Sequence, residues 1–195
     1  MTCLVRIGNR VRSTKETNVR ASVEIDGAGH ASVKTTVHFV DHLIATLATH
    51  SLMNIQVEAS GDLVHHVVED VAIALGEAIS EALGTRNGII RFGYALVPMD
   101  EALALASVDL VRRSHSSVDL KITRPLVENL PSEDLTHFLT SLAASLEATL
   151  HVKVQYGEND HHKVEAAFKA LALSLRQACA VDTRRSGAPS SKGAL

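Results

Sequence analysis

The stretch NDHHKVEAAF, residues 159–168, sets two adjacent histidines and a glutamate at the start of a predicted helix. The same pattern, H-H-x-V-E, begins at His65, 96 positions before its second copy at His161. A glycine lies four residues before each copy, and a lone histidine, His42 or His137, lies 23 or 24 residues before it. Matches that recur in one register over half a chain indicate an internal duplication.

Apolar spacing around these two stretches predicts an α+β fold, in which a unit of three strands, a helix, a strand and a helix occurs twice. We predict strands at 18–26, 31–37, 53–60, 88–99, 101–110, 116–122 and 151–156. We predict helices at 41–49, 65–83, 132–150 and 161–180, with Ser132 as an N-cap. The expected organisation is a first repeat at 1–88, a second at 89–181 and a polar tail at 182–195.

The composition of the 195-residue chain narrows its class. It is 46% hydrophobic and 21% charged, which is typical of a globular protein. A net charge of −3, 3% aromatic residues and no tryptophan argue against a nucleic-acid partner. Two cysteines do not make a disulfide framework, and no apolar run is long enough for a membrane span. Since no apolar leader is visible, we expect a cytoplasmic protein.

Helix geometry gives the repeated pattern a chemical meaning. Residues four apart lie on one face, so His161 and Glu165 can hold one ion together, and so can His65 and Glu69. The second histidine of each pair points about 100° away around the helix axis and would serve another ion, element or subunit. The pattern therefore predicts two related metal sites that draw ligands from both halves. One pair alone would equally suit a helix surface; two copies favour metal. Imidazole and carboxylate without thiolate suit manganese, iron or zinc.

The chain resembles the imidazoleglycerol-phosphate dehydratase family of histidine biosynthesis over nearly its whole length. The matching stretches are RSTKET at 12–17, FVDHLIATLATHS at 39–51, GDLVHHVVEDVAIALGEAI at 61–79, RFGYALVPMDEALA at 91–104, DHHKVEAAFKALALSLRQA at 160–178 and PSSKG at 189–193. The resemblance implies a two-layer α/β fold like domain 2 of ribosomal protein S5, with sheets packed against helices. It also implies a homo-oligomeric 24-subunit shell, two Mn²⁺ per subunit and active sites between subunits, over which the tail at 182–195 would close.

The resemblance also assigns roles to individual residues. The metal ligands would be His42, His65, His66, Glu69, His137, His161, His162 and Glu165. Catalytic roles would fall to Glu16, His42, His66, Glu69, His162 and Glu165. Substrate contacts would come from Glu16, His42, His50, His65, His66, Glu69, Arg91, Arg113, His161, Lys169, Ser190, Ser191 and Lys192. From helix geometry we expect His65 and Glu69 at one ion and His161 and Glu165 at the other, with His66 and His162 crossing over.

The implied reaction converts D-erythro-imidazoleglycerol phosphate to imidazole acetol phosphate and water. The proton to be removed is barely acidic, because no carbonyl lies beside its carbon. A metal-bound imidazolate could expel hydroxide through a diazafulvene-like intermediate, with Glu16 as the general acid/base. Arginine and lysine side chains would hold the phosphate.

The sequence departs from the family pattern at two places, and two other functions are also compatible with its metal-binding pattern. LVHHV at 63–67 replaces the usual Asp-Asp-His-His-Thr, so the outer-shell support of the ligands is expected to differ. Arg112 precedes Arg113 in DLVRRSH and could compete with it for phosphate. The alternatives are a dinuclear phosphoester hydrolase and a metal-assembled shell without catalysis. Both explain fewer of the matching residues.

Overall fold

The computed structural model describes residues 5–193 and contains two four-stranded sheets with the same strand order. The first sheet runs β1-β2-β4-β3 and is formed by Ile7–Ser13, Thr17–Glu24, Asn54–Gly61 and Ala31–Lys34. The second runs β5-β6-β10-β7 and is formed by Phe92–Met99, Ala102–Asp109, Thr149–Tyr156 and His115–Asp119. In both sheets the first three strands pair antiparallel, and the last pair is parallel.

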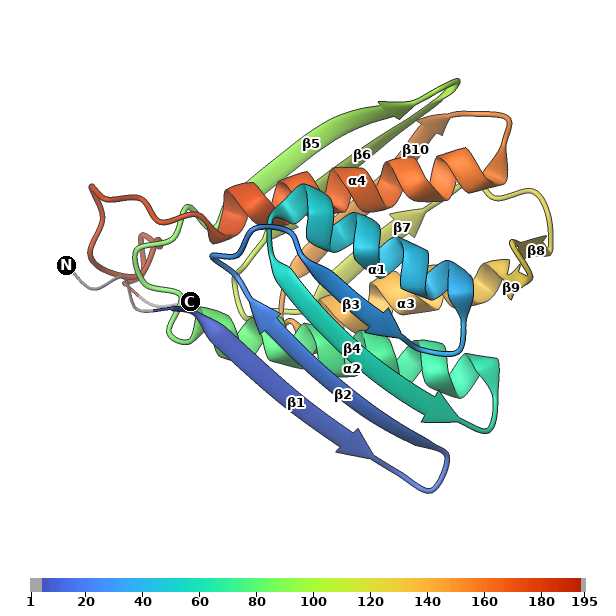
Figure 1. The fold of residues 1–195 in the computed structure, drawn as a ribbon. Helices are drawn as coiled ribbons and strands as arrows, with labels where there is room; N and C mark the ends of the chain where they lie inside the picture. Colours follow the sequence, from blue (N-terminus) through green and yellow to red (C-terminus); the bar gives the residue numbers. More distant parts are fainter. Residues whose placement is uncertain (1–4, 194–195) are drawn as a thin grey trace.

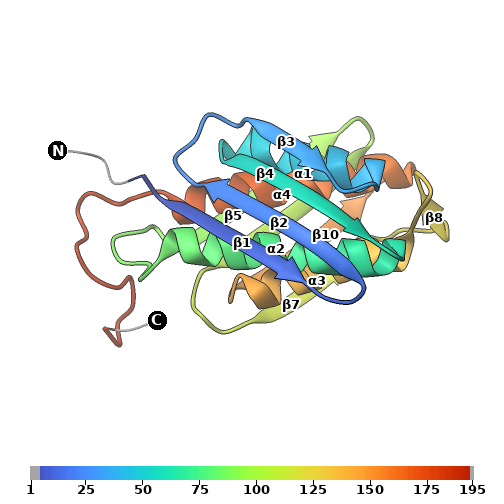
Figure 2. The ribbon, with the colours of Figure 1, turned by 60° about the horizontal axis from the view of Figure 1, so that its bottom comes forward.

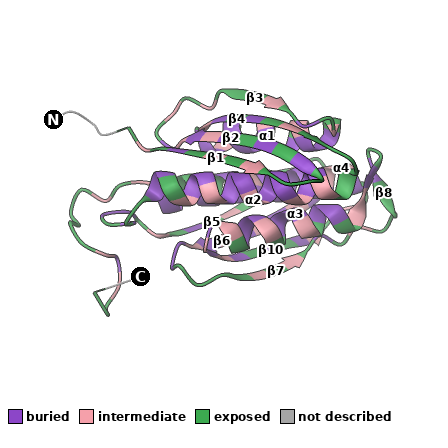
Figure 3. Ribbon diagram, turned by 90° about the horizontal axis from the view of Figure 1, so that it is seen from below, coloured by how far each residue is buried: buried purple, intermediate pink, exposed green. Residues whose placement is uncertain are grey.

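Within the described residues four helices lie between the two sheets (Figure 1). They are α1 (His38–Ser51), α2 (Val64–Leu83), α3 (Ser132–Ser145) and α4 (Asp160–Cys179). Each half is a two-layer arrangement of one sheet and a helix pair, and the halves meet where α1 packs on α4 and α2 packs on α3. The helix faces that meet the sheets and each other are buried, while the outer strands expose alternate residues (Figure 3). This period-2 alternation is typical of a sheet with one face on a core.

Two glycines show how closely helix and sheet approach in each half. Gly8 is the second residue of β1, and Gly93 is the second residue of β5. A Cβ atom at Gly8 would overlap the carbonyl oxygen of Ala78 in α2. A Cβ atom at Gly93 would overlap the carbonyl oxygen of Ser174 in α4. The same absence of a side chain therefore lets the long helix of each half lie directly against its sheet.

The third helix begins at Ser132, as predicted, but differs from the prediction in its N-cap and in its last residue. Ser132 is not its N-cap: Pro131 holds that position, and Ser132 is already helical. The helix ends at Ser145, five residues before the predicted end, because Glu147 adopts a left-handed backbone at φ 53°. The fully buried guanidinium of Arg86 then donates to the carbonyl oxygens of Leu146 and Glu147, at 2.6 and 2.9 Å. This capping frees residues 149–156 to become β10.

Two further elements have no residue assignment in the sequence analysis. β1 supplies the third strand expected for the first half, and the short β8 (Leu126–Val127) and β9 (Leu130–Pro131) form a hairpin before α3. In Figure 1, α1 to α4 all begin at the end of the molecule where this hairpin lies. Figure 2 shows the described part of the C-terminal tail running past the opposite end of α2. Among residues 5–193, no helix combines the length and apolarity that a membrane span needs.

Candidate functional site

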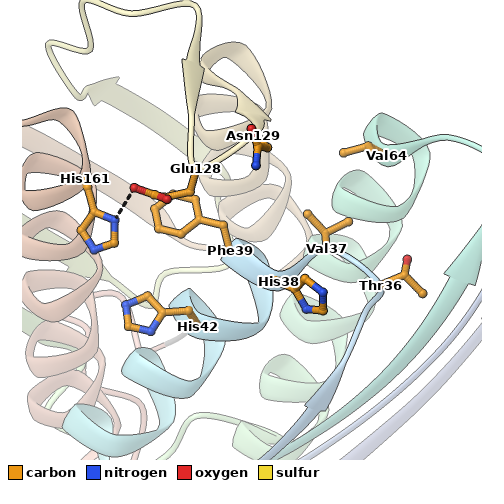
Figure 4. Close-up of a pocket in the computed structure, with 9 residues that line it drawn as sticks. All are labelled: Thr36, Val37, His38, Phe39, His42, Val64, Glu128, Asn129 and His161. Atoms are coloured by element: carbon orange, nitrogen blue, oxygen red, sulfur yellow. Dashed lines mark hydrogen bonds and ion pairs between the residues drawn. The ribbon is translucent and has the colours of Figure 1, made fainter.

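One cluster of metal-binding side chains joins α1 to α4 and contains His42, His161 and Glu165. The Nε2 atoms of His42 and His161 lie 3.0 and 3.1 Å from the same carboxylate oxygen of Glu165, Oε2. One potential ligand atom from each residue lies within 4.8 Å of the others. His42 and His161 line a cavity of about 520 Å³. Figure 4 shows their rings near each other and beside Phe39. Three donors that converge in this way can hold one divalent ion.

A second cluster joins α2 to α3 and contains His65, Glu69 and His137. The rings of His65 and His137 stack with their centroids 5.1 Å apart. The Nε2 atom of His137 is buried and lies 3.3 Å from Glu69 Oε1, yet it has no hydrogen-bond partner among the described residues. A buried polar atom without a partner is costly, and a metal ion would satisfy it. The donor set and this unpaired nitrogen both fit a bound cation.

In both clusters, helix geometry brings two of the residues together and the packing of a second helix adds the third. The i, i+4 pairs lie one turn apart because each copy of the repeated pattern opens a helix. The third member comes from the other half of the chain: His42 on α1 reaches α4, and His137 on α3 reaches α2. Each cluster thus combines residues of both repeats.

The remaining two histidines of the motifs point away from these clusters. His66 Nδ1 lies 2.8 Å from Asp62 and 3.8 Å from Glu16. His162 Nδ1 lies 2.7 Å from Glu101. The pKa of His66 is raised by its hydrogen bond to Asp62, and the pKa of His162 is raised by its hydrogen bond to Glu101.

Glu165 is the most strongly perturbed carboxylate among the cluster residues. Burial opposes its ionisation, but hydrogen bonds from Lys169 and His42 lower the pKa of Glu165 to about 2. The Nζ atom of Lys169 lies 2.8 Å from Glu165 Oε1, one helical turn along α4. The carboxylate is therefore ionised at neutral pH and available as a ligand.

A separate basic cavity of about 490 Å³ lies between the described tail and the loop after β6. It gathers five sequence-predicted substrate residues and the neighbouring Arg112; the five are Arg91, Arg113, Ser190, Ser191 and Lys192. Arg91 is held by a two-pronged ion pair with Asp109, at 2.6 and 3.0 Å, which raises the pKa of Arg91. Its third contact is the carbonyl oxygen of Pro189, at 2.8 Å, which ties the tail to the cavity.

Arg112 lines this cavity, but its guanidinium is already hydrogen-bonded to other groups of the protein. Its guanidinium donates to the carbonyl oxygen of Gly84 at 2.6 Å and to Glu147 at 3.1 Å. Arg113 and Lys192 are exposed, so they are the cations best placed for an incoming anion. The engagement of Arg112 with Gly84 and Glu147 favours Arg113 in the competition expected from the sequence.

Two predicted substrate residues, Lys169 and His50, lie neither in the basic cavity nor in a histidine cluster. Lys169 lies against Glu165 rather than in the basic cavity. His50 is in the last turn of α1, eight residues beyond His42, or about 12 Å along the helix. The structure brings His50 to neither cluster.

Several residues around the clusters were missed by the sequence analysis. Phe39 stacks on His42 and lies 5.3 Å from the ring of His161. Glu128, in the β8–β9 hairpin, lies 3.2 Å from His161 Nδ1, and the buried Asp134 lies 2.6 Å from His65 Nδ1. The one sequence signal that could have singled out Asp134 is its position in the first turn of α3, where an acidic side chain is favourable to the helix dipole.

Comparisons with known proteins agree on one family. Residues 35–175 match the family model described as imidazoleglycerol-phosphate dehydratase. A relative of that name from Phytophthora nicotianae is 47% identical over 194 residues, which are 98% of this chain but 43% of the relative. One from Chlorobium phaeovibrioides is 44% identical over 96% of this chain and 94% of its own length. The crystal structure of IGPD from Pyrococcus furiosus has a TM-score of 0.84 at 37% identity, covering 95% of this chain and 100% of that one.

Proposed function

Because this chain belongs to the imidazoleglycerol-phosphate dehydratase family, hydro-lyases of histidine biosynthesis, we propose that it dehydrates D-erythro-imidazoleglycerol phosphate to imidazole acetol phosphate in a metal-dependent reaction. The observation that carries the metal dependence is the convergence of imidazole and carboxylate groups in two clusters built alike from both halves. Manganese is the first choice of ion, and other divalent transition metals would also suit these ligands.

The residues that would hold the ions are the two clusters and the outward-facing His66 and His162. The buried Nε2 of His137 supports this assignment, because it lies 3.3 Å from the carboxylate of Glu69 without a hydrogen bond, and an ion bound by both groups would satisfy it. So does the ionised state of Glu165. When bound, divalent ions would act as Lewis acids toward the imidazole ring of the substrate.

Proton transfer is the task that we assign to Glu16. The reaction breaks one carbon–hydrogen bond and one carbon–oxygen bond, releases water, and leaves an enol that becomes the ketone. A group that accepts a proton and returns one must therefore lie at the ring end of the substrate. Glu16 is exposed in the β1–β2 turn, and its carboxylate lies 3.8 Å from His66 Nδ1. Its position beside a proposed ligand supports the role.

The basic cavity is the proposed phosphate site. Arg113 and Lys192 would supply charge, and the hydroxyl groups of Ser190 and Ser191 would donate hydrogen bonds to phosphate oxygens. Arg91 keeps the described tail near the cavity through the carbonyl of Pro189. Closure of the tail over the substrate is part of this proposal.

The positions of the clusters and the basic cavity support an active site shared between copies of the chain. His161 opens α4, whereas the backbone N–H of Arg91 donates to the carbonyl of Ala178 near the end of that helix. The 20 residues of α4 span about 30 Å. With bonds of about 1.5 Å, the three-carbon chain of the substrate bridges less than about 10 Å between ring and phosphate. One chain therefore does not serve both ends of one substrate, and we propose a homo-oligomer, with the 24-subunit shell as its expected form.

A metal-reconstitution assay tests the proposed reaction. The chain is stripped with a chelator, divided, and returned to buffer with or without Mn²⁺. We expect imidazole acetol phosphate from imidazoleglycerol phosphate only in the manganese sample. Equal turnover in both samples would contradict metal dependence. Release of inorganic phosphate in place of the ketone would instead identify a phosphoester hydrolase. Metal-bound, assembled protein that forms neither product would leave only a structural shell.

A further inference from the structure

The four histidines of the two H-H-x-V-E motifs share one feature that their spacing does not require. Each has a carboxylate at its Nδ1 atom. The partners are Asp134 for His65 at 2.6 Å, Asp62 for His66 at 2.8 Å, Glu128 for His161 at 3.2 Å and Glu101 for His162 at 2.7 Å. None of these four acids belongs to either cluster of converging ligand atoms.

Duplication of an ancestral unit accounts for only part of these four contacts. Asp134 lies in the first turn of α3, and Glu128 lies in the β8–β9 hairpin. Asp62 precedes α2, and its counterpart ahead of α4 is Glu158, yet the acid that contacts His162 is Glu101 in the β5–β6 turn. Glu101 directly precedes β6 as Glu16 directly precedes β2, and Glu16 lies 3.8 Å from His66 Nδ1, so shared ancestry can account for that contact. Asp134 and Glu128 reach the first histidine of each pair from different positions, which a shared chemical requirement explains better than shared ancestry does.

The chemical consequence of such a contact is the choice of tautomer. A neutral imidazole carries one proton, on Nδ1 or on Nε2, and a carboxylate can only accept it. A carboxylate at Nδ1 therefore holds the proton there and leaves a lone pair on Nε2. In His161 both ring nitrogens face a carboxylate, Nδ1 that of Glu128 at 3.2 Å and Nε2 that of Glu165 at 3.1 Å, so an ion bound at Nε2 would replace the Glu165 contact and leave the proton with Glu128. A fixed tautomer also fixes the direction of the ring.

Asp134 makes the strongest case among the four. Its side chain is 3% exposed, whereas the side chain of His65 is 51% exposed. Burial of a carboxylate is unfavourable unless a donor compensates it, and the imidazole of His65 is the donor that the structure supplies. Glu133, the adjacent residue in the same helical turn, is exposed.

We propose that Asp134, Asp62, Glu128 and Glu101 are positioning residues, each of which holds the Nδ1 proton of one histidine so that Nε2 is free to bind a divalent ion. This inference rests on the metal binding proposed above. It also identifies the outer-shell support in a chain that lacks the two aspartates usual before the first histidine pair, since Leu63 and Val64 occupy those positions.

The first test compares Asp134→Asn with Glu133→Gln in the metal-free, full-length chain. An asparagine can turn its amide N–H toward Nδ1 and so favour the wrong tautomer of His65. Free Mn²⁺ measured by electron paramagnetic resonance gives the dissociation constant. We expect Asp134→Asn to raise it by about 10- to 100-fold. Glu133→Gln removes the same charge one residue away and should change it less than about twofold.

A second readout follows the tautomer itself. Nitrogen-15 NMR of histidine-labelled, metal-free protein distinguishes a protonated Nδ1 from a protonated Nε2. We expect the Nδ1–H form for His65 of the unmodified chain and a gain of its Nε2–H form in Asp134→Asn. A merely structural role for Asp134 would alter unfolding but not the tautomer. Equal effects of Asp134→Asn and Glu133→Gln on manganese binding would overturn the proposal.

Exposed partners keep the proposal testable if Asp134→Asn does not fold. Asp62→Asn and Glu101→Gln change surface side chains that are 54% and 37% exposed. Each should also weaken manganese binding, whereas Glu158→Gln, at the counterpart of Asp62, should not. Unmodified protein that binds no manganese would refute the proposed metal dependence. If Asp62→Asn and Glu101→Gln bind manganese as tightly as the unmodified protein does, only the positioning role is refuted.

Discussion

Glu16 shows how a single exposed residue is placed by its neighbours. The hydroxyl of Thr14 accepts hydrogen bonds from the backbone N–H groups of Glu16 and Thr17. Thr17 donates its own hydroxyl proton to Asp70, and the guanidinium of Arg12 also contacts that carboxylate. Asp70 follows Glu69 on α2, so the β1–β2 turn is pinned to the helix that carries the proposed ligands.

This arrangement predicts the behaviour of Glu16→Gln. The side chain is exposed and is not a proposed ligand, so metal content and assembly should be unchanged. Turnover should fall by at least about 100-fold, because an amide cannot exchange the proton. Steady-state assay together with metal analysis measures both effects, and Lys15→Gln serves as the neighbouring control. Near-normal turnover in Glu16→Gln would exclude its acid/base role.

At the scale of elements, the loop after β6 is held from two sides. Arg112 adopts a left-handed backbone, at φ 58°, and ties the loop to Gly84 after α2 and to Glu147 after α3. On the other side of the loop, the Thr149 hydroxyl donates to the carbonyl oxygen of Arg113. Arg113 therefore enters the basic cavity from a loop that is anchored on both sides.

We expect Arg112→Gly to separate substrate binding from stability. Glycine loses both side-chain hydrogen bonds but tolerates the left-handed backbone, so unfolding free energy should change by less than about 1 kcal/mol. The KM for the phosphorylated substrate should rise several-fold with kcat little changed, because Arg113 is less well held. Denaturant unfolding and steady-state kinetics give the two quantities. An unaltered KM would show that Arg113 needs no support from Arg112.

At the scale of the whole molecule, the two functional regions lie at opposite ends. The four helices begin at one end of the molecule, and the described tail lies at the other end (Figure 1). The histidine motifs open α2 and α4 at the first end, and the tail residues Ser190 to Lys192 line the basic cavity at the second. Glu16 belongs to the first region and Arg113 to the second. We therefore expect a complete site to require a second copy of the chain.

Mixing two inactive variants tests this arrangement. Glu16→Gln and Arg113→Ala should each have low activity alone. When they are dissociated by metal removal and reassembled together in equal amounts, about a quarter of the sites should receive both intact residues, given random assembly and two contributing subunits. Activity should return to about that fraction of the unmodified value. Reassembled mixtures that stay as inactive as the separate variants would place both residues in the same chain's site.

Much of the fold follows from local patterns in the sequence. Strand alternation and helical spacing depend on residues close together in the chain, so most strands, the helix starts and the i, i+4 pairs of His65 with Glu69 and His161 with Glu165 were predictable. The end of α3 was not, because the buried Arg86 that caps it comes from a distant loop. Strand β1 and the β8–β9 hairpin were also left unassigned.

The features of the candidate site can likewise be separated into those that local sequence determines and those that depend on long-range packing. The sequence by itself determined which residue types repeat, and therefore which histidines and glutamates could bind metal. Only the tertiary structure decided that α1 meets α4 and α2 meets α3, which acids face each Nδ1 atom, and that Arg112 is already engaged. It also decided that the basic cavity lies far from both clusters. The physical reason is that these contacts join residues distant in sequence, whose approach depends on the packing of the whole chain rather than on a local period.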